Sequence, residues 1–124
     1  MAIPTIAHPG SITTHQMRKV DRVMIEDLGI TLERMMENAG RNLAVLVRHR
    51  FAPSSVTVLV GPGGNGGGGL VAARHLANRG IAVTVTTTRD PTTFTPVPAA
   101  QARTLKRLGV PFSSDPQPAD LILD

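Results

Sequence analysis

The sequence predicts an α/β chain whose core is a parallel β-sheet. Residues 56–60 and 81–87 are apolar, β-branched runs with the length and composition of buried strands, and residues 119–124 form another apolar run. Segments with apolar residues at helical spacing separate these runs. Because parallel neighbouring strands need crossover helices, this alternation predicts βαβ units and a sheet with both faces covered.

The part that precedes this alternation is predicted to be helical. Residues 1–11 show no pattern and are predicted to be irregular, whereas residues 12–52 carry the spacing of two helices. Thr13 and Gln16 have the spacing of a capping box at the start of the first helix, and Gly29 is suited to end it. The apolar faces comprise Met17, Val20, Met24 and Leu28 in the first helix and Leu32, Met35, Met36, Ala39, Leu43, Leu46 and Val47 in the second.

Residues 56–124 are predicted to fold as β–α–β–α–β. A glycine-rich segment follows the first strand and leads into a helix. A loop rich in proline and threonine follows the second strand and leads into another helix, which ends at Gly109. The predicted boundaries are 56–60, 81–87 and 119–124 for the strands, 61–69 for the glycine segment, 88–98 for the second loop and 110–112 for a short extended piece.

The chain stops within its third predicted strand, Leu121–Asp124. Doubly wound sheets usually continue beyond three parallel strands, and a bare apolar edge favours association. We therefore expect residues 1–124 to form a single domain that is truncated after the third strand. We also expect a partner chain to cover that strand, with a homo-oligomer as the simplest arrangement.

Composition excludes several classes of protein. The chain of 124 residues is 41% hydrophobic and 18% charged, as globular domains are, and no apolar run has the roughly 20 residues of a membrane-spanning helix. The lack of cysteine and of a signal-peptide pattern predicts a cytoplasmic protein. A net charge of +4, with three Phe and no Tyr or Trp, does not predict a nucleic-acid groove.

The glycine segment 61–69 is the strongest functional signal. Glycine lets a ligand approach the main chain, and the following helix offers free N–H groups and its positive dipole end to a phosphate. Gly61 to Gly66 match the pattern G-x-G-x-x-G, but the acidic residue expected about 20 positions on is lacking, since Asp90 is about thirty away. The segment predicts a phosphorylated ligand, most simply a nucleotide. A flexible linker or a plain strand-to-helix turn stays open as the alternative.

A few polar side chains near this segment have two interpretations each. The amide of Asn65 can bind a ligand or a hard cation, or Asn65 can simply occupy a turn position with positive φ. Asn38 can contact the glycine segment or a partner subunit, or merely lie in mid-helix. His49 and His75 are interpreted as surface or internally satisfied residues rather than as catalysts.

Motifs along nearly the whole chain, from Ile12 onward, resemble the YjeF N-terminal domain family. In chain order, these motifs are Thr13–Asp21, Met36–Arg41, Val58–Gly63, Asn65–Gly67, Gly69–Leu76 and Ala119–Asp124. Six motifs in the same order are far more specific than a glycine pattern alone. The resemblance implies a Rossmann-like three-layer sandwich, which agrees with the predicted alternation of strands and helices.

The best-known activity of this family is NAD(P)H-hydrate epimerase, an isomerase. The resemblance implies that hydrated NADH or NADPH is the substrate. Its epimers are interconverted so that an ADP/ATP-dependent dehydratase, as a separate partner or a fused domain, can restore the cofactor. The hydrated carbon lies beside the ring nitrogen, whose lone pair can expel the hydroxyl, so the site must supply a general acid. No catalytic residue is singled out.

The resemblance also implies which residues bind. The family's substrate loop, Asn-Asn-Gly-Gly-Asp, corresponds here to Gly64, Asn65, Gly66, Gly67 and Gly68. Two of its three polar side chains are thus absent, at Gly64 and Gly68. A potassium ion is implied as cofactor, held by Asn65 and by Asp124. Because the family's later binding residues lie beyond residue 124, we expect little or no epimerase activity from this chain alone.

Two other functions remain open. One is a non-catalytic nucleotide-binding or scaffold relative of the same family, which Gly64 and Gly68 favour. The other is a dinucleotide-binding fragment of an oxidoreductase, which the missing ribose-binding acid disfavours.

Overall fold

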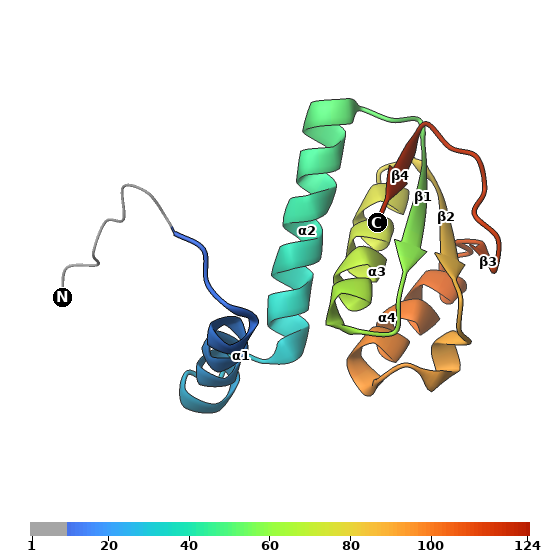
Figure 1. Ribbon diagram of the computed structural model, residues 1–124. Coiled ribbons are helices and arrows are strands. Elements are labelled where there is room, and N and C mark those ends of the chain that lie inside the picture. Colours follow the sequence, from blue (N-terminus) through green and yellow to red (C-terminus); the bar gives the residue numbers. More distant parts are fainter. Residues whose placement is uncertain (1–9) are drawn as a thin grey trace. The chain divides into compact units, whose positions relative to one another are not determined.

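The computed structural model of the chain describes residues 10–124, which fall into two units, residues 10–31 and residues 32–124 (Figure 1). Each unit is described by itself. Of the segment 1–11 that was predicted to be irregular, residues 1–9 lie outside the described part, and Gly10 and Ser11 have no regular structure.

The first unit contains helix α1 (Thr14–Arg22), which continues as the π-helix η1 (Val23–Asp27). The predicted capping box is confirmed: Gln16 N donates to Thr13 Oγ1 at 3.1 Å, and Thr13 N donates to Gln16 Oε1 at 2.7 Å. Gly29 follows with φ of +68°, as predicted for the residue that ends this helix. No residue of α1 or η1 is buried, so their apolar stripe remains partly exposed.

The second unit begins with helix α2 (Leu32–Phe51). Its buried positions are three or four residues apart and therefore form one face. The helix ends at Phe51, and the next residue, Ala52, has φ of +44° and precedes Pro53, a residue that cannot continue a helix. The buried residues of α2 are Met36, Gly40, Ala44 and Val47.

A parallel sheet of four strands follows, with the order β3-β2-β1-β4. Its strands are β1 (Ser55–Val60), β2 (Ala82–Thr87), β3 (Phe112–Ser113) and β4 (Leu121–Leu123). The parallel pairing confirms the predicted α/β fold class. The short piece predicted only as extended is strand β3, which lies beside β2 at one edge. Strand β4, predicted as the third strand, forms the other edge.

Helix α3 (Gly64–Ala77) packs on β1 and β2, between α2 and α4 (Pro96–Arg107), as Figure 1 shows. Helix α4 follows a short 3-10 turn, η2 (Pro91–Thr93). The register places Val56 opposite Val83 and Leu121, so these residues share the face of the sheet that α3 covers. The core of this face includes Val58, Val60, Val85, Leu70, Leu76, Ala102 and Leu105.

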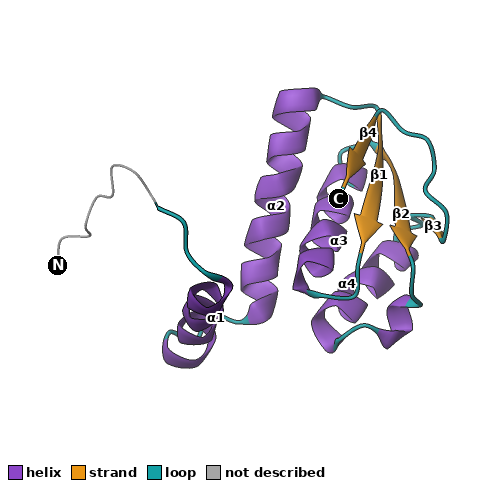
Figure 2. Cartoon of the chain, in the orientation of Figure 1, coloured by secondary structure: helices purple, strands orange, loops and turns teal. Residues whose placement is uncertain are grey.

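The helices of the second unit lie on one side of the sheet (Figure 2). The opposite face carries threonines, and the connection from β3 to β4 closes over it: Thr57 Oγ1 donates to the Gln117 carbonyl at 2.6 Å. On the same face, Ile122 is 51% exposed and the Thr86 hydroxyl is buried without a partner in the described structure. The second helical layer of a three-layer sandwich is therefore not formed by residues 32–124.

Two predicted helix starts are wrong. Helix α3 begins at Gly64 instead of after a loop that runs to residue 69, and α4 begins at Pro96, inside the loop predicted over 88–98. In α4 the fixed φ of Pro96 suits the first helical turn. In α3 tertiary contacts outweigh the poor helix propensity of glycine.

Candidate functional site

The candidate site lies at the carboxyl end of β1, where the strand order reverses. Strands β2 and β3 follow β1 on one side, whereas β4 pairs with β1 on the other side. Parallel α/β sheets bind ligands in the crevice at such a switch point. The chain leaves β1 at Val60, passes through Gly61–Gly63 and enters α3 at Gly64. The glycine segment therefore lies where this fold places a ligand.

The start of α3 presents backbone donors. Gly63 is the N-cap and makes no side-chain cap, and Gly67 N donates to the Gly63 carbonyl at 3.2 Å. The N–H groups of Gly64, Asn65 and Gly66 precede this bond and have no partner within the helix. The first turn of α3 contains no acidic residue. These donors and the positive end of the helix dipole suit an anion.

Three glycines are required by close packing around this helix start. A Cβ at Gly66 would lie 2.0 Å from the Gly61 carbonyl oxygen, and one at Gly67 would lie 2.4 Å from Met36 Cε. A Cβ at Gly40 of α2 would lie 2.5 Å from Val71 Cβ and 2.7 Å from the Gly68 carbonyl oxygen. The absence of side chains therefore brings the first turn of α3 against both the end of β1 and α2.

Gly64 and Gly68 differ from these three glycines. A Cβ at either position would meet nothing within 4 Å. Gly64 is exposed and Gly68 is half-buried. The structure thus has room for a Cβ at these two positions, where the resemblance implies Asn and Asp. Their absence here removes polar groups without being required by packing.

Asn65 lies in the first turn of α3 with its side chain exposed. Ala52 is the one non-glycine residue among those described with positive φ, so the interpretation of Asn65 as a positive-φ turn residue is wrong. Its amide has no hydrogen bond to another described residue. The remaining interpretation, a contact with a ligand or cation, stays a prediction.

Asp124 directly follows β4, whose Leu123 pairs with Val58. Because β4 and β1 are parallel, Asp124 lies at the same end of the sheet as the glycine segment, the end where the strands finish. Its carboxylate is exposed and, within the described residues, unpaired. The oxygens of Asn65 and Asp124 are hard donors of the kind that suit potassium. No group of three or more His, Cys, Asp or Glu side chains in residues 10–124 could hold a metal ion by itself.

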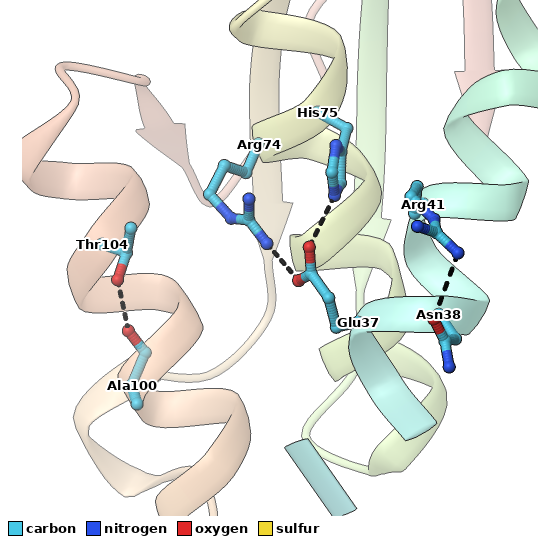
Figure 3. Close-up of polar contacts among 7 residues, drawn as sticks. All are labelled: Glu37, Asn38, Arg41, Arg74, His75, Ala100 and Thr104. Carbon is cyan, nitrogen blue, oxygen red and sulfur yellow. Dashed lines mark hydrogen bonds and ion pairs between the residues drawn. The ribbon is translucent and has the colours of Figure 1, made fainter. Parts of the chain in front are cut away.

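Glu37 connects α2 to α3 through two side chains (Figure 3). Its carboxylate accepts a hydrogen bond from Arg74 and lies 2.8 Å from His75 Nε2. Partial burial raises the pKa of Glu37, but the hydrogen bond with His75 and the charge of Arg74 outweigh that effect and lower the pKa below the ordinary value. His75 is therefore an internally bonded residue, as interpreted from the sequence.

Sequence reasoning missed the role of Glu37, although Glu37 belongs to a motif that carried the resemblance. Asn38 was the residue singled out there, and its Oδ1 accepts only from Arg41 at 3.2 Å on the exposed side of α2. The interpretation that Asn38 contacts the glycine segment is wrong. One signal for Glu37 existed: it directly follows buried Met36, whereas Arg74 directly follows buried Ala73. Opposite charges that border two buried helix faces can meet when those faces pack together.

The comparison with known proteins establishes the family. Residues 32–124 match the family described as YjeF-related protein N-terminus. The chain belongs to this family. It is 44% identical, over 91% of its length, to an NAD(P)H-hydrate epimerase of Dehalogenimonas lykanthroporepellens, of which it covers 49%. It is also 43% identical, over 60% of its length, to a bifunctional NAD(P)H-hydrate repair enzyme Nnr of Methanopyrus kandleri, of which it covers 15%.

Solved structures agree with this assignment. The crystal structure of yeast ynu0, YNL200c, superimposes with a TM-score of 0.77 at 29% sequence identity. The match covers 86% of this chain and 48% of the yeast chain. This YjeF-related chain therefore spans about half the length of the epimerase relative and of the yeast protein. Among residues 10–124, no helix has the length and apolar character needed to cross a membrane.

Proposed function

We propose that this chain provides the nucleotide-binding half of an NAD(P)H-hydrate epimerase. The observation that carries the proposal is the uncapped, glycine-packed start of α3 at the switch point of the sheet. The names of relatives with 44% and 36% identity over most of the chain support the epimerase activity. In this proposal, the N–H groups of Gly64, Asn65 and Gly66 hold a phosphate of hydrated NADH or NADPH.

In the proposed reaction, the substrate supplies the electron pair and the protein supplies the proton. The lone pair of the ring nitrogen expels the neighbouring hydroxyl, and water returns on either face, so that the two epimers interconvert. The protein must protonate the leaving hydroxyl. No residue from Gly61 to Gly69 has a titratable side chain. The glycine segment thus binds and orients the substrate, and the general acid comes from elsewhere in the complete site.

Potassium is the proposed cofactor. The amide oxygen of Asn65 and the carboxylate of Asp124 would hold the ion, and a bound cation would add positive charge beside the phosphates of the substrate. Two oxygen ligands from the described residues are fewer than the six to eight that hard cations such as calcium accept. The remaining ligands in this proposal are water, substrate or residues outside the described part.

Further proposals concern partners and location. Relatives named as bifunctional NAD(P)H-hydrate repair enzymes suggest that an ADP/ATP-dependent dehydratase cooperates with this chain as a fused or separate protein. A homo-oligomer that covers β4 and a cytoplasmic location are proposed from the sequence alone.

The first test measures nucleotide binding by the isolated chain. We expect ADP-ribose to raise the melting temperature in potassium chloride by several degrees more than in sodium chloride. Asn65→Ala should remove this dependence on potassium, whereas the control Asn78→Ala, at the other end of α3, should retain it. No stabilisation by ADP-ribose in either salt would overturn the proposal.

A second candidate is a non-catalytic nucleotide-binding relative, which the bare positions Gly64 and Gly68 favour. The double substitution Gly64→Asn, Gly68→Asp restores the family loop where the structure leaves space. If the chain is the binding half of an epimerase weakened at these positions, its affinity for hydrated NADH should rise at least tenfold. If the protein is a scaffold, this affinity should stay unchanged.

A further inference from the structure

A pocket lies at the end of the sheet where β1 and β2 begin, away from the glycine segment. It is formed where α2 ends, where the chain enters β1, and where the turn after α3 leads to β2. Its volume is about 490 Å³, within the range of small-molecule sites. The lining residues are Arg48, His49, Ala52, Pro53, Arg79 and Ile81.

The lining of the pocket is positively charged. Arg48 is half-buried, Arg79 is exposed, and neither makes an ion pair with a described residue. No carboxylate lines the pocket. Asp120 lies before β4 at the same end of the sheet, where its Oδ2 accepts from Ser54 N at 2.9 Å, and it is not among the lining residues.

The helix dipoles explain only part of this charge. Both α2 and α3 end at this end of the sheet, and the dipole of each helix places the equivalent of about half a negative charge there. Together they amount to about one negative charge, against the two guanidinium groups of Arg48 and Arg79. The lining residues therefore keep about one positive charge, which an anion can balance.

Part of the pocket lining is apolar and is tied to the end of α2. Ala52, Pro53 and Ile81 contribute the apolar lining. Ala52 holds φ of +44°, an unfavourable conformation for a residue with a side chain. Its N–H donates to the carbonyls of Val47 and Arg48, which ties this turn to the end of α2.

We propose that this pocket binds a small phosphate-bearing molecule. The planar guanidinium groups of Arg48 and Arg79 suit phosphate oxygens, which they can bind in bidentate fashion. His49 adds a third donor, and the apolar lining residues contact the uncharged part of the ligand. The lining contains no Phe, Tyr or Trp, whereas nucleic-acid grooves interleave basic residues with such aromatics, so the pocket does not indicate nucleic acid.

The test is calorimetric titration of the chain with inorganic pyrophosphate at 0.15 M salt, with malonate as a carboxylate probe. We expect pyrophosphate to bind at least tenfold more tightly than malonate. The double variant R48Q/R79Q should weaken pyrophosphate binding at least tenfold. Arg107→Gln, an exposed arginine on α4, should leave binding unchanged.

Three results would overturn the proposal: full binding by R48Q/R79Q, an equal loss in Arg107→Gln, or malonate binding as tight as that of pyrophosphate. If the double variant does not fold, the single variant Arg79→Gln, which changes an exposed side chain, decides the question. It should weaken binding about threefold or more, and unchanged affinity would count against the pocket.

Discussion

The two ends of helix α3 are anchored in opposite ways. At its start, contact depends on missing side chains, because Gly66 lies against the Gly61 carbonyl and Gly67 against Met36. In its second half, contact depends on long side chains, because Arg74 and His75 reach across to Glu37 on α2. One helix is thus held by backbone proximity at one end and by charge at the other.

This difference follows from what each end must do. The start of α3 must leave its N–H groups free for a ligand, so a capping side chain there would occupy the site. Packing by glycine fixes the helix start without using those donors. The second half has no such constraint, and side chains that are 17–41% exposed hold it to α2. The glycine contacts should therefore be rigid and intolerant of substitution, whereas the charged contacts should be weaker and dependent on pH.

The largest effect should come from Gly66→Ala. Its Cβ would lie 2.0 Å from the backbone oxygen of Gly61, a group that cannot rotate away. We expect the free energy of unfolding to fall by about 3 kcal/mol, at the upper end of the range for overpacking. Urea unfolding measures this change, and titration with ADP-ribose should show a parallel loss of binding.

Gly68→Ala is the matched control, because a Cβ there meets nothing within 4 Å. Alanine favours the helix over glycine by up to about 1 kcal/mol, so this variant should be as stable as the parent or slightly more stable. Equal destabilisation by the two substitutions would mean that helix propensity, and not contact with Gly61, governs the helix start.

The sequence predicted the strands well because their pattern is local. The run 56–60 is β1 within one residue, since alternating β-branched residues already specify a buried strand. The start of α3 could not be predicted in the same way. Local propensity disfavours glycine in a helix, and the contacts with Gly61 and Met36 that outweigh it come from tertiary structure.

For the site as well, features set by a local sequence pattern could be predicted, and features that depend on residues far apart in the sequence could not. The G-x-G-x-x-G pattern indicated an anion-binding helix start, which the free N–H groups of α3 support. The assignments of substrate to Gly64–Gly68 and of potassium to Asn65 and Asp124 came from the family resemblance and stay predictions. The contacts of Glu37 could not be predicted from local sequence, because Arg74 lies 37 positions and His75 lies 38 positions further along the chain. Strand β3, with two residues, is too short for any periodic signal.

Gly40→Ala should have an intermediate effect and tests the glycine contact from the side of α2. Its Cβ would lie 2.5 Å from Val71 Cβ, a side-chain atom, and 2.7 Å from the Gly68 carbonyl oxygen. Helix α2 can move away slightly, so we expect a loss of about 2 kcal/mol in urea unfolding. An unchanged midpoint would show that α2 adjusts freely, and the distinction between the two ends of α3 would then be lost.

The smallest effect should come from Glu37→Gln. Because the carboxylate is 41% exposed, solvent screening limits its pairs with Arg74 and His75, and we expect a loss of about 1 kcal/mol or less at neutral pH. The pKa of Glu37 is lower in the folded chain than in the unfolded chain. Its contribution is therefore fully present above the ordinary glutamate pKa and is lost as the pH falls through the lowered value.

Unfolding measured at neutral pH and at acidic pH separates this contribution from the others. The difference in stability between the parent and Glu37→Gln should vanish in acid, whereas the loss caused by Gly66→Ala should be independent of pH, since no titrating group takes part in that contact. Glu33→Gln, on the first turn of α2, controls for the removal of a carboxylate that makes no pair with α3. A penalty for Glu37→Gln that persisted at low pH would show that the side chain packs between the helices by shape, as the glycines do, and not by charge.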